Sequence, residues 1–157
     1  MHMRDLLNNI KKGKKVASIF TDMDNTDKCS TGFIGNVSDD FVVIKHISPS
    51  GKYDGFLLKS MEKIYRVDFN GEYENRVQYL YRLQNQNHKE IAEKYSSLIL
   101  DIIDFAEKNS VVISLELYNS GHDDIQGYIK DVDNERLEIR RLDDSGKEDG
   151  ISMVNIS

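Results

Sequence analysis

The stretch Thr31–Glu62, TGFIGNVSDDFVVIKHISPSGKYDGFLLKSME, decides the fold because the chain repeats most of it. Gly127–Ser157, GYIKDVDNERLEIRRLDDSGKEDGISMVNIS, aligns without a gap with Gly32–Glu62, at a shift of 95 residues. The identical pairs are Gly32/Gly127, Ile34/Ile129, Val37/Val132, Ile44/Ile139, Ser50/Ser145, Gly51/Gly146, Lys52/Lys147, Asp54/Asp149 and Gly55/Gly150. Such a repeat indicates two copies of one structural unit. We therefore expect two small β-modules.

Each copy is predicted to be a small antiparallel barrel. In the first copy, β-branched and aromatic residues lie between turn signals, which is typical of short strands. Gly35 lies inside one of them, where a bulge or sharp bend helps a small barrel to close. The expected strands are Val16–Thr21, Gly32–Asp39, Phe41–Ser48, Phe56–Leu58 and Glu62–Phe69. Five short, bent strands favour a barrel of SH3-like or oligonucleotide-fold size.

The second copy lacks a counterpart to the last of these strands. Its expected strands are Val111–Leu117, Gly127–Val132, Leu137–Leu142 and Ile151–Val154, with a loop over Tyr118–Asp124. An unpaired strand edge favours aggregation, so proteins usually cover it. We expect another segment of the chain, a partner subunit or residues beyond this sequence to take the missing place.

Three helices are expected outside the strands. Asp5–Lys12 has apolar residues at helical spacing and stops at Gly13, and we expect it to cover the open end or side of the first barrel. Glu72–Leu83 reads as a second helix. His88–Lys108 carries a continuous apolar stripe, with Asn87 as its N-cap. This stripe is expected to pack between or beneath the barrels, with a partner helix as the less favoured alternative.

The predicted fold class is α+β with strands dominant. It consists of two tandem SH3-like or Sm-like barrels of the five-strand type, linked by a helical segment, with the second copy lacking its last strand. The predicted division is an N-terminal helix and first barrel over 1–70, a helical connector over 71–109 and the incomplete second repeat over 110–157.

Composition and charge restrict the location and the partners. No apolar run approaches the roughly 20 residues that span a membrane, and the N-terminus lacks the apolar core of a signal peptide. Cys29 is the only cysteine, which excludes an internal disulfide and fits a reducing cytoplasm. The net charge of −6 argues against non-specific nucleic-acid binding, which requires excess Lys and Arg. We expect a cytoplasmic protein without a membrane partner.

The order of elements and a sequence motif resemble the Sm-like fold. Gly32–Ile34 and Val37–Ile44 are similar to the family's first motif, in which a glycine and a hydrophobic residue precede an aspartate and alternating hydrophobic residues. In the second copy the matching positions are Gly127–Ile129, Val132, Asn134 and Leu137–Ile139. Sm-like proteins typically assemble as rings, and two fused copies in one chain could replace the ring by a pseudo-dimer.

Sm-like proteins also bind single-stranded RNA in pockets formed by two turns. The resemblance places these turns at Asp39-Asp40 and Lys59–Glu62 in the first copy, and at Asn134-Glu135 and Val154–Ile156 in the second. Both copies lack the Arg-Gly pair of the family's second motif, and acidic residues at the first turn would repel phosphate. The resemblance therefore implies the fold more strongly than the RNA pocket.

Paired basic residues recur in both copies and form one candidate contact site. Lys45 and His46 lie on the central strand of the first copy and align with Arg140 and Arg141. They could bind phosphate or an acidic peptide. The alternation with apolar neighbours favours the other interpretation, in which they are outward positions of a strand.

The repeated Ser-Gly-Lys-x-Asp-Gly turn, at 50–55 and 145–150, is the second candidate. Two glycines around a polar centre are what a tight hairpin loop requires. A ligand loop would have the same composition, with Lys52 and Lys147 as contacts to an anion. We favour the structural turn.

No catalytic residue, metal site or cofactor is expected. Asp22, Asp24 and Asp27 resemble a calcium loop only superficially, because the glycine and terminal glutamate of an EF-hand are missing. The sequence has no phosphate loop, paired-histidine zinc motif, Cys-x-x-Cys or nucleophile elbow. His88 and His122 lie in polar segments and are expected to face solvent.

The sequence therefore predicts a non-enzymatic interaction or scaffolding protein, which binds a protein partner or self-associates through exposed strand edges. The alternative is an RNA-binding regulator of the Sm-like type, which the resemblance supports and the net charge opposes. A basic groove joining Lys45, His46, Arg140 and Arg141 would favour RNA, whereas an open edge or an apolar strip would favour protein.

Overall fold

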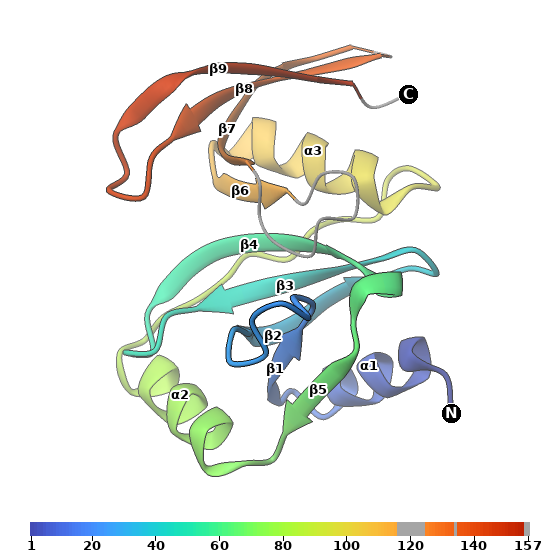
Figure 1. Cartoon of the computed structure of the whole chain (residues 1–157), viewed down its shortest axis with the longest axis vertical. Coiled ribbons are helices and arrows are strands. Elements are labelled where there is room, and N and C mark those ends of the chain that lie inside the picture. Colours follow the sequence, from blue (N-terminus) through green and yellow to red (C-terminus); the bar gives the residue numbers. More distant parts are fainter. Residues whose placement is uncertain (116–124, 134, 156–157) are drawn as a thin grey trace.

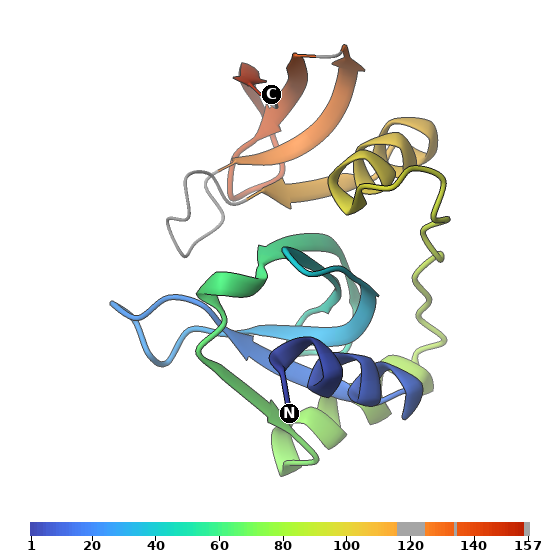
Figure 2. The ribbon, with the colours of Figure 1, turned by 90° about the vertical axis from the view of Figure 1, so that its right-hand side faces the viewer.

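A computed structural model describes residues 1–115, 125–133 and 135–155. Within these ranges, nine strands form one open sheet in the order β5-β1-β2-β3-β4-β6-β7-β8-β9, and three α-helices pack against it (Figures 1 and 2). The predicted mixture of strands and helices is confirmed. Two separate closed barrels are not found, because pairing between β4 and β6 joins both repeats into one sheet. The loop expected over 118–124, His122, Asn134 and Ile156 lie outside the described residues.

The elements follow the predicted order, with changes at their ends. The first repeat and the helix after it contain α1 (Met3–Lys12), β1 (Val16–Phe20), β2 (Ser30–Val37), β3 (Phe41–Ile47), β4 (Tyr53–Ser60), the 3₁₀ turn η1 (Met61–Lys63), β5 (Arg66–Phe69) and α2 (Glu72–Leu83). The second repeat contains α3 (Leu98–Asn109), β6 (Val112–Leu115), β7 (Ile125–Val132), β8 (Arg136–Leu142) and β9 (Glu148–Asn155). The strand expected over Glu62–Phe69 is thus divided into η1 and a short β5.

The two repeats share backbone hydrogen bonds as well as sequence. The amide of Ser48 donates to the carbonyl oxygen of Lys52 at 2.9 Å, and the amide of Asp143 donates to that of Lys147 at 2.8 Å. The Ser48 hydroxyl and the Asp143 carboxylate accept the amide hydrogens of the same two lysines, at 3.1 and 3.0 Å. Register shifts recur in the β2–β3 and β7–β8 pairs, and in the β3–β4 and β8–β9 pairs. The sequence repeat is therefore a structural repeat.

The first strands of the two repeats match at a shift of 96 residues, one more than the rest of the repeat. Val16 of β1 pairs with Phe33, whereas Val112 of β6 pairs with Tyr128, and Phe33 and Tyr128 are aligned in sequence. β6 is therefore the counterpart of β1, and Ser114 is the counterpart of Ser18.

β4 takes the place of the strand that the second repeat lacks. In the first repeat, β1 lies between β2 and β5. In the second repeat, β6 lies between β7 and β4, with Phe56 opposite Ile113 and Leu58 opposite Leu115 in a parallel pair. Of the three occupants considered above, the structure uses another segment of the same chain.

Each helix covers a different part of the sheet. α1 buries Leu7 and Ile10 against the first repeat, and α2 buries Val77 and Tyr81 against β1 and β3. α3 lies in the largest core, between β3–β4 on one side and β6–β8 on the other. The residues of that core are Val43, Phe56, Leu58, Ile91, Leu98, Ile102, Ile103, Phe105, Ala106, Ile113, Leu115, Ile129, Leu137 and Ile139. The two repeats therefore share one apolar core.

The helix predicted over His88–Lys108 begins only at Leu98. Its N-cap is Ser97, whose side-chain oxygen accepts the amide hydrogen of Leu100 at 3.4 Å, so the prediction of Asn87 as the cap is wrong. Residues 88–97 instead form an extended connection from α2 to α3, which we call the strap (Figure 2).

Tertiary contacts explain why the strap is not helical. The carbonyl oxygen of Ile91 accepts a hydrogen bond from the Asn36 side chain at 3.1 Å, and the Ile91 side chain is buried in the shared core. Asp101 of α3 accepts the amide hydrogens of Lys94 and Tyr95 at 3.0 and 2.8 Å. These bonds replace the ones that a helix would make, and packing overrides the helical spacing of the apolar residues.

Candidate functional site

The outer edge of β9 is open. β4 pairs with β3 on one side and with β6 on the other, but its counterpart β9 pairs only with β8 among the described strands. β9 has eight residues and contains neither the lysine nor the proline that often protects an edge strand. Over residues 148–154, this side of β9 has no partner among the described strands, so its backbone N–H and C=O groups can pair with a further strand.

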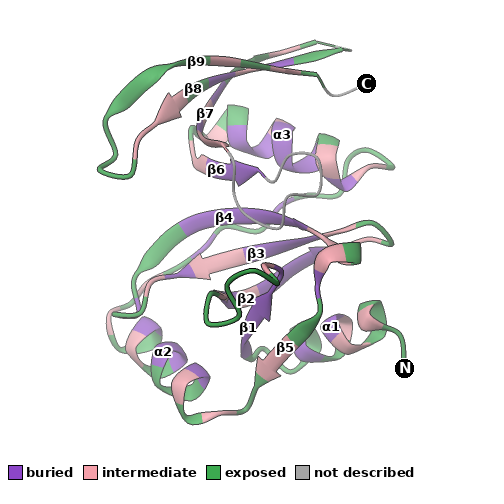
Figure 3. Cartoon of the chain, in the orientation of Figure 1, coloured by how far each residue is buried: buried purple, intermediate pink, exposed green. Residues whose placement is uncertain are grey.

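Two apolar side chains on β9 are exposed, although their counterparts on β4 are buried. Phe56 is 1% exposed and aligns with Ile151, which is 51% exposed. Leu58 is 6% exposed and aligns with Met153, which is 57% exposed. Phe56 packs edge-on against Phe105 of α3, with 5.1 Å between the ring centroids. In Figure 3, accordingly, β4 is largely buried, whereas β9 is exposed or intermediate along its length.

The strand beside β9 is charged where the first repeat is apolar. Phe41 and Val43 of β3 align with Arg136 and Glu138 of β8. Glu138 lies 3.8 Å from the ammonium group of Lys130. The exposed face of the second repeat is therefore a narrow apolar strip on β9 next to a charged strand, which suits a face in contact with water.

Three of the predicted basic residues have acidic partners. The Lys45 ammonium group pairs with Glu90 of the strap. The Nδ1 atom of His46 lies 3.0 Å from a carboxylate oxygen of Asp54. Arg140 donates to Glu148 at 3.1 Å, and its guanidinium carbon lies 5.9 Å from the centre of the Tyr128 ring. These pairs reduce the positive charge available to a phosphate.

The other three predicted contact residues do not gather with these basic residues in one site; they are Arg141, Lys52 and Lys147. The Nε atom of Arg141 is buried without a hydrogen-bond partner in the described part of the chain. Arg141 lines a cavity of about 330 Å³ with three aspartates, whereas His46 lines a cavity of about 500 Å³ between the repeats. Lys52 and Lys147 lie exposed at the two equivalent turns. The basic groove that would favour RNA is therefore not formed.

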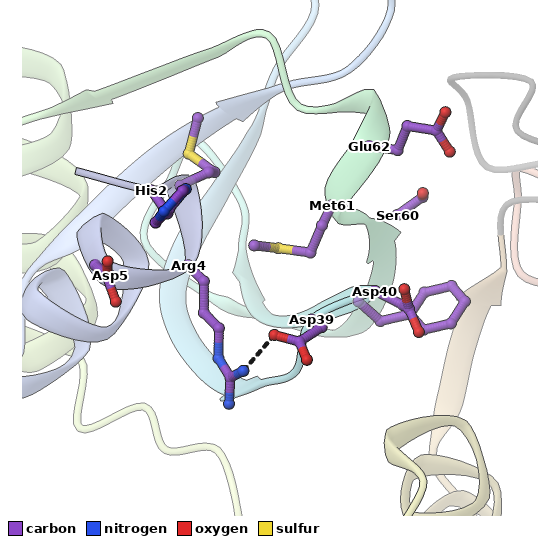
Figure 4. A pocket seen from close by; sticks show the side chains of 10 residues that line it. His2, Arg4, Asp5, Asp39, Asp40, Ser60, Met61 and Glu62 are labelled. Atoms are coloured by element: carbon purple, nitrogen blue, oxygen red, sulfur yellow. Dashed lines mark hydrogen bonds and ion pairs between the residues drawn. The ribbon is translucent and has the colours of Figure 1, made fainter.

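A cavity of about 850 Å³ lies at the turns where the Sm-like resemblance places an RNA pocket (Figure 4). Its lining residues come from the start of α1, the β2–β3 turn and the end of β4 with η1; they are His2, Met3, Arg4, Asp5, Asp39, Asp40, Phe41, Ser60, Met61 and Glu62. The Arg4 guanidinium is bound by Asp39. Because carboxylates outnumber cations here, the cavity repels a phosphate backbone.

His88 is buried, so the prediction that it faces solvent is wrong. The Tyr81 hydroxyl donates to Nδ1 at 2.9 Å, and Nε2–H donates to the carbonyl oxygen of Gly55 at 2.9 Å. Burial lowers the pKa of His88 to about 4, although the hydrogen bond to Gly55 acts in the opposite direction. The neutral imidazole joins the strap to α2 and β4. Its polar sequence neighbours gave no signal of this role.

The described residues contain no group of three or more His, Cys, Asp or Glu side chains placed to hold a metal ion. In the same part of the chain, no helix has the length and apolar character needed to cross a membrane. Comparison with known proteins found no matching family model, curated protein or solved structure.

Proposed function

We propose that this chain is a non-catalytic interaction protein built from two Sm-like repeats, and that it binds through the open edge of β9. One observation carries the proposal: β4 pairs with β6 and is buried against α3, whereas the equivalent β9 has no second partner among the described strands and exposes Ile151 and Met153. An exposed strand edge binds an added strand through main-chain hydrogen bonds and selects it through side-chain contacts. We place the protein in the cytoplasm, where Cys29 stays reduced.

The proposed occupant of the edge is β9 of a second copy, in antiparallel orientation. A two-fold axis at Ser152 would place Ile151 of one copy opposite Met153 of the other. Directly opposite residues of an antiparallel pair point to the same face of the sheet. Four apolar side chains that are exposed in one copy would then form a single patch, and the sheet would continue through both copies.

The test is the molar mass of the chain in solution, measured by light scattering between about 1 µM and 1 mM, a range that detects weak pairing. We expect the mass to rise from the monomer value of 18.1 kDa towards twice that value. The double variant Ile151→Lys/Met153→Lys should remain monomeric. Tyr79→Lys/Leu83→Lys is the matched control, because it charges two apolar residues that are equally exposed on α2. A wild-type chain that stays monomeric throughout would refute the proposal.

Titration with labelled single-stranded RNA pools at two salt concentrations tests the alternative function. We expect no saturable binding, because the basic residues are paired and the turn cavity is acidic. Binding that weakens with salt and is lost in Lys45→Glu/Arg140→Glu would replace our proposal by RNA recognition.

A further inference from the structure

The cavity of about 500 Å³ between the repeats is the second repeat's counterpart of the α2-binding surface. In the first repeat, Val77 and Tyr81 of α2 pack against Val16, Phe33 and Ile47. Polar contacts orient the helix. The Ser18 hydroxyl donates to Glu74 at 2.9 Å, and Gln78 accepts the amide hydrogen of Val16 at 2.9 Å. α2 is thus held by an apolar pair spaced i, i+4 and by polar groups beside it.

The counterparts of the surface beneath α2 all line this one cavity. Val16, Ser18, Thr31, Phe33, Ile47 and Gly51 correspond to Val112, Ser114, Gln126, Tyr128, Leu142 and Gly146. All six of these second-repeat residues belong to the cavity wall. The opposite wall comes from the β3–β4 hairpin of the first repeat, including Tyr53 and Asp54. We call this cavity the junction groove.

Two pairs of equivalent residues indicate that no helix of the described residues occupies the junction groove. A Cβ atom at Gly51 would lie 2.4 Å from Cβ of Leu80 in α2, whereas a Cβ atom at Gly146 would meet nothing within 4 Å. Ser18 is hydrogen-bonded to α2, and its counterpart Ser114, a residue only 8% exposed, lines the junction groove. The polar group and the space for a helix are both present in the second repeat.

We propose that the junction groove binds an amphipathic helix of a partner protein. By analogy with α2, this helix presents two large apolar residues at i and i+4 to Val112, Tyr128 and Leu142, and a hydrogen-bonding side chain to Ser114. Recognition of a helix by an apolar groove through such anchors is a common mode of peptide binding. The volume of about 500 Å³ falls within the range of natural ligand sites.

Acidic residues of the junction groove indicate which charge the last turn of the partner helix carries. Asp143 and Asp144 replace Ser48 and Pro49 at the equivalent turn, and Asp54 lies across the groove. In the first repeat, Gln84 at the end of α2 donates to the carbonyl oxygen of Ser50 at 2.9 Å. A partner helix in the same orientation would place its last turn beside the three aspartates. We expect Lys or Arg there, where the helix dipole also favours a cation.

The helix comes from another protein rather than from a second copy of this chain. α2 is already bound in its own repeat, where Val77 is fully buried and Tyr81 is 7% exposed. Its release would expose that surface. The inference goes beyond the proposed pairing at β9, because the junction groove is a different surface and each proposal can fail without the other.

Helical peptides derived from α2 provide the probe. One labelled, side-chain-stapled peptide has the sequence of residues 72–84 with Glu74→Gln and Gln84→Lys; a second has Gln84→Glu instead. Stapling compensates for the low helicity of so short a peptide. The full chain carrying Ile151→Lys/Met153→Lys is titrated, so that pairing at β9 does not contribute, and binding is followed by anisotropy and amide NMR shifts.

We expect the lysine peptide to bind with a dissociation constant on the order of 100 µM and to shift the amide signals of Ser114, Gln126 and Gly146. The glutamate peptide should bind about fivefold more weakly. Leu142→Ser should weaken both peptides. Asp144→Asn should reduce the difference between them, whereas the control Glu135→Gln, which neutralises an exposed acid at another turn, should not.

The inference would be overturned by either of two results. One is the absence of saturable binding by both peptides to a folded chain at millimolar concentration. The other is binding that Leu142→Ser leaves unchanged, or that shifts signals only in the first repeat, because the peptide would then bind elsewhere.

Discussion

The Nε2–H group of His88 donates a 2.9 Å hydrogen bond to the carbonyl oxygen of Gly55, and this bond fixes the strap to β4. The same imidazole accepts the Tyr81 hydroxyl of α2 and packs at 90° to the Phe56 ring. The Tyr81 hydroxyl can donate to Nδ1 only while the ring is neutral, with its proton on Nε2. Protonation would place a second N–H opposite the Tyr81 oxygen and a charge in the shared core.

Stability should therefore fall as the pH is lowered from about 6.5 to about 4. The unfolded chain binds a proton at His88 with a pKa near 6.5, whereas burial lowers the pKa in the folded chain to about 4. Between these values the unfolded state holds more protons, so the free energy of unfolding decreases by up to about 3 kcal/mol as the pH falls. Urea unfolding at a series of pH values measures this slope.

His88→Gln should flatten the slope in this pH window. Carboxylates with a lowered pKa, such as Asp104 beside Lys108 and Lys94, lose their contribution to stability only below this pH window. The loss of stability below the window should therefore be the same in the variant and the wild-type chain, which makes it an internal reference. If the variant is too unstable, the NMR signals of His88 in the wild-type chain provide the check. A ring that titrates near pH 6.5 in the folded chain would contradict the burial of His88.

Gly51 should tolerate alanine much less well than Gly146. Both have φ near +80°, at 81° and 83°, which costs an alanine roughly 1 kcal/mol. At Gly51 the added methyl group would also collide with the backbone of α2, lying 2.8 Å from the carbonyl carbon of Leu80. We expect Gly51→Ala to lower the free energy of unfolding by about 3 kcal/mol or more and Gly146→Ala by about 1 kcal/mol. If chemical denaturation gives the same loss in the free energy of unfolding for both variants, α2 does not contact the Gly51 turn closely.

The repeated turns and most strands could be predicted because their signals are local. Gly51 and Gly146 lie at the same position of the repeated loop, and Ile44 and Ile139 lie at the same buried position of equivalent strands. The parallel pairing of Phe56 with Ile113 could not be predicted in this way, because it joins distant segments. Ile91 lies within the apolar stripe of the helix predicted over His88–Lys108, but its burial comes from contacts in the extended strap.

At the candidate sites too, residues with a local signal could be predicted, whereas contacts between distant segments could not. Lys45 and Arg140 were identified by their repetition, but their acidic partners differ, Glu90 in the strap and Glu148 on β9, and no alignment of the two copies reveals both. The junction groove could not be predicted, because α2 occurs once in the sequence. Strand pairing makes Ser114 the counterpart of Ser18, at a shift that the gapless alignment does not contain.

The start of α3 can be tested with two candidate N-caps. Ser97→Ala should lower the free energy of unfolding by about 1 kcal/mol, because the Ser97 side chain accepts the amide hydrogen of Leu100. Asn87→Ala should change it by less than about 0.5 kcal/mol, since Asn87 is exposed in the structure. Hydrogen exchange should also be fast at residues 92–93 and slow at 102–106. The reverse order of the two variants would restore the helix expected from residue 88.

Phe56 and Ile151 provide the sharpest comparison of the two repeats. They hold the same position, opposite Lys45 and Arg140 respectively. Phe56→Ala would leave a cavity among Phe105, His88 and Tyr53, and we expect a loss of about 3–5 kcal/mol in the free energy of unfolding. Ile151→Ala should cost less than about 1 kcal/mol in dilute solution, because half of the side chain already faces water.

The dependence on protein concentration distinguishes what Ile151 contributes within one chain from what it contributes to pairing between two copies. If β9 pairs with a second copy, the cost of Ile151→Ala should grow with protein concentration, because association stabilises only the folded wild-type chain. The cost of Phe56→Ala should include a large part that is independent of concentration, since its contacts lie within one chain. Thermal unfolding at about 5 µM and about 500 µM measures both dependences. A cost for Ile151→Ala that is large and constant would mean that β9 is covered by its own chain.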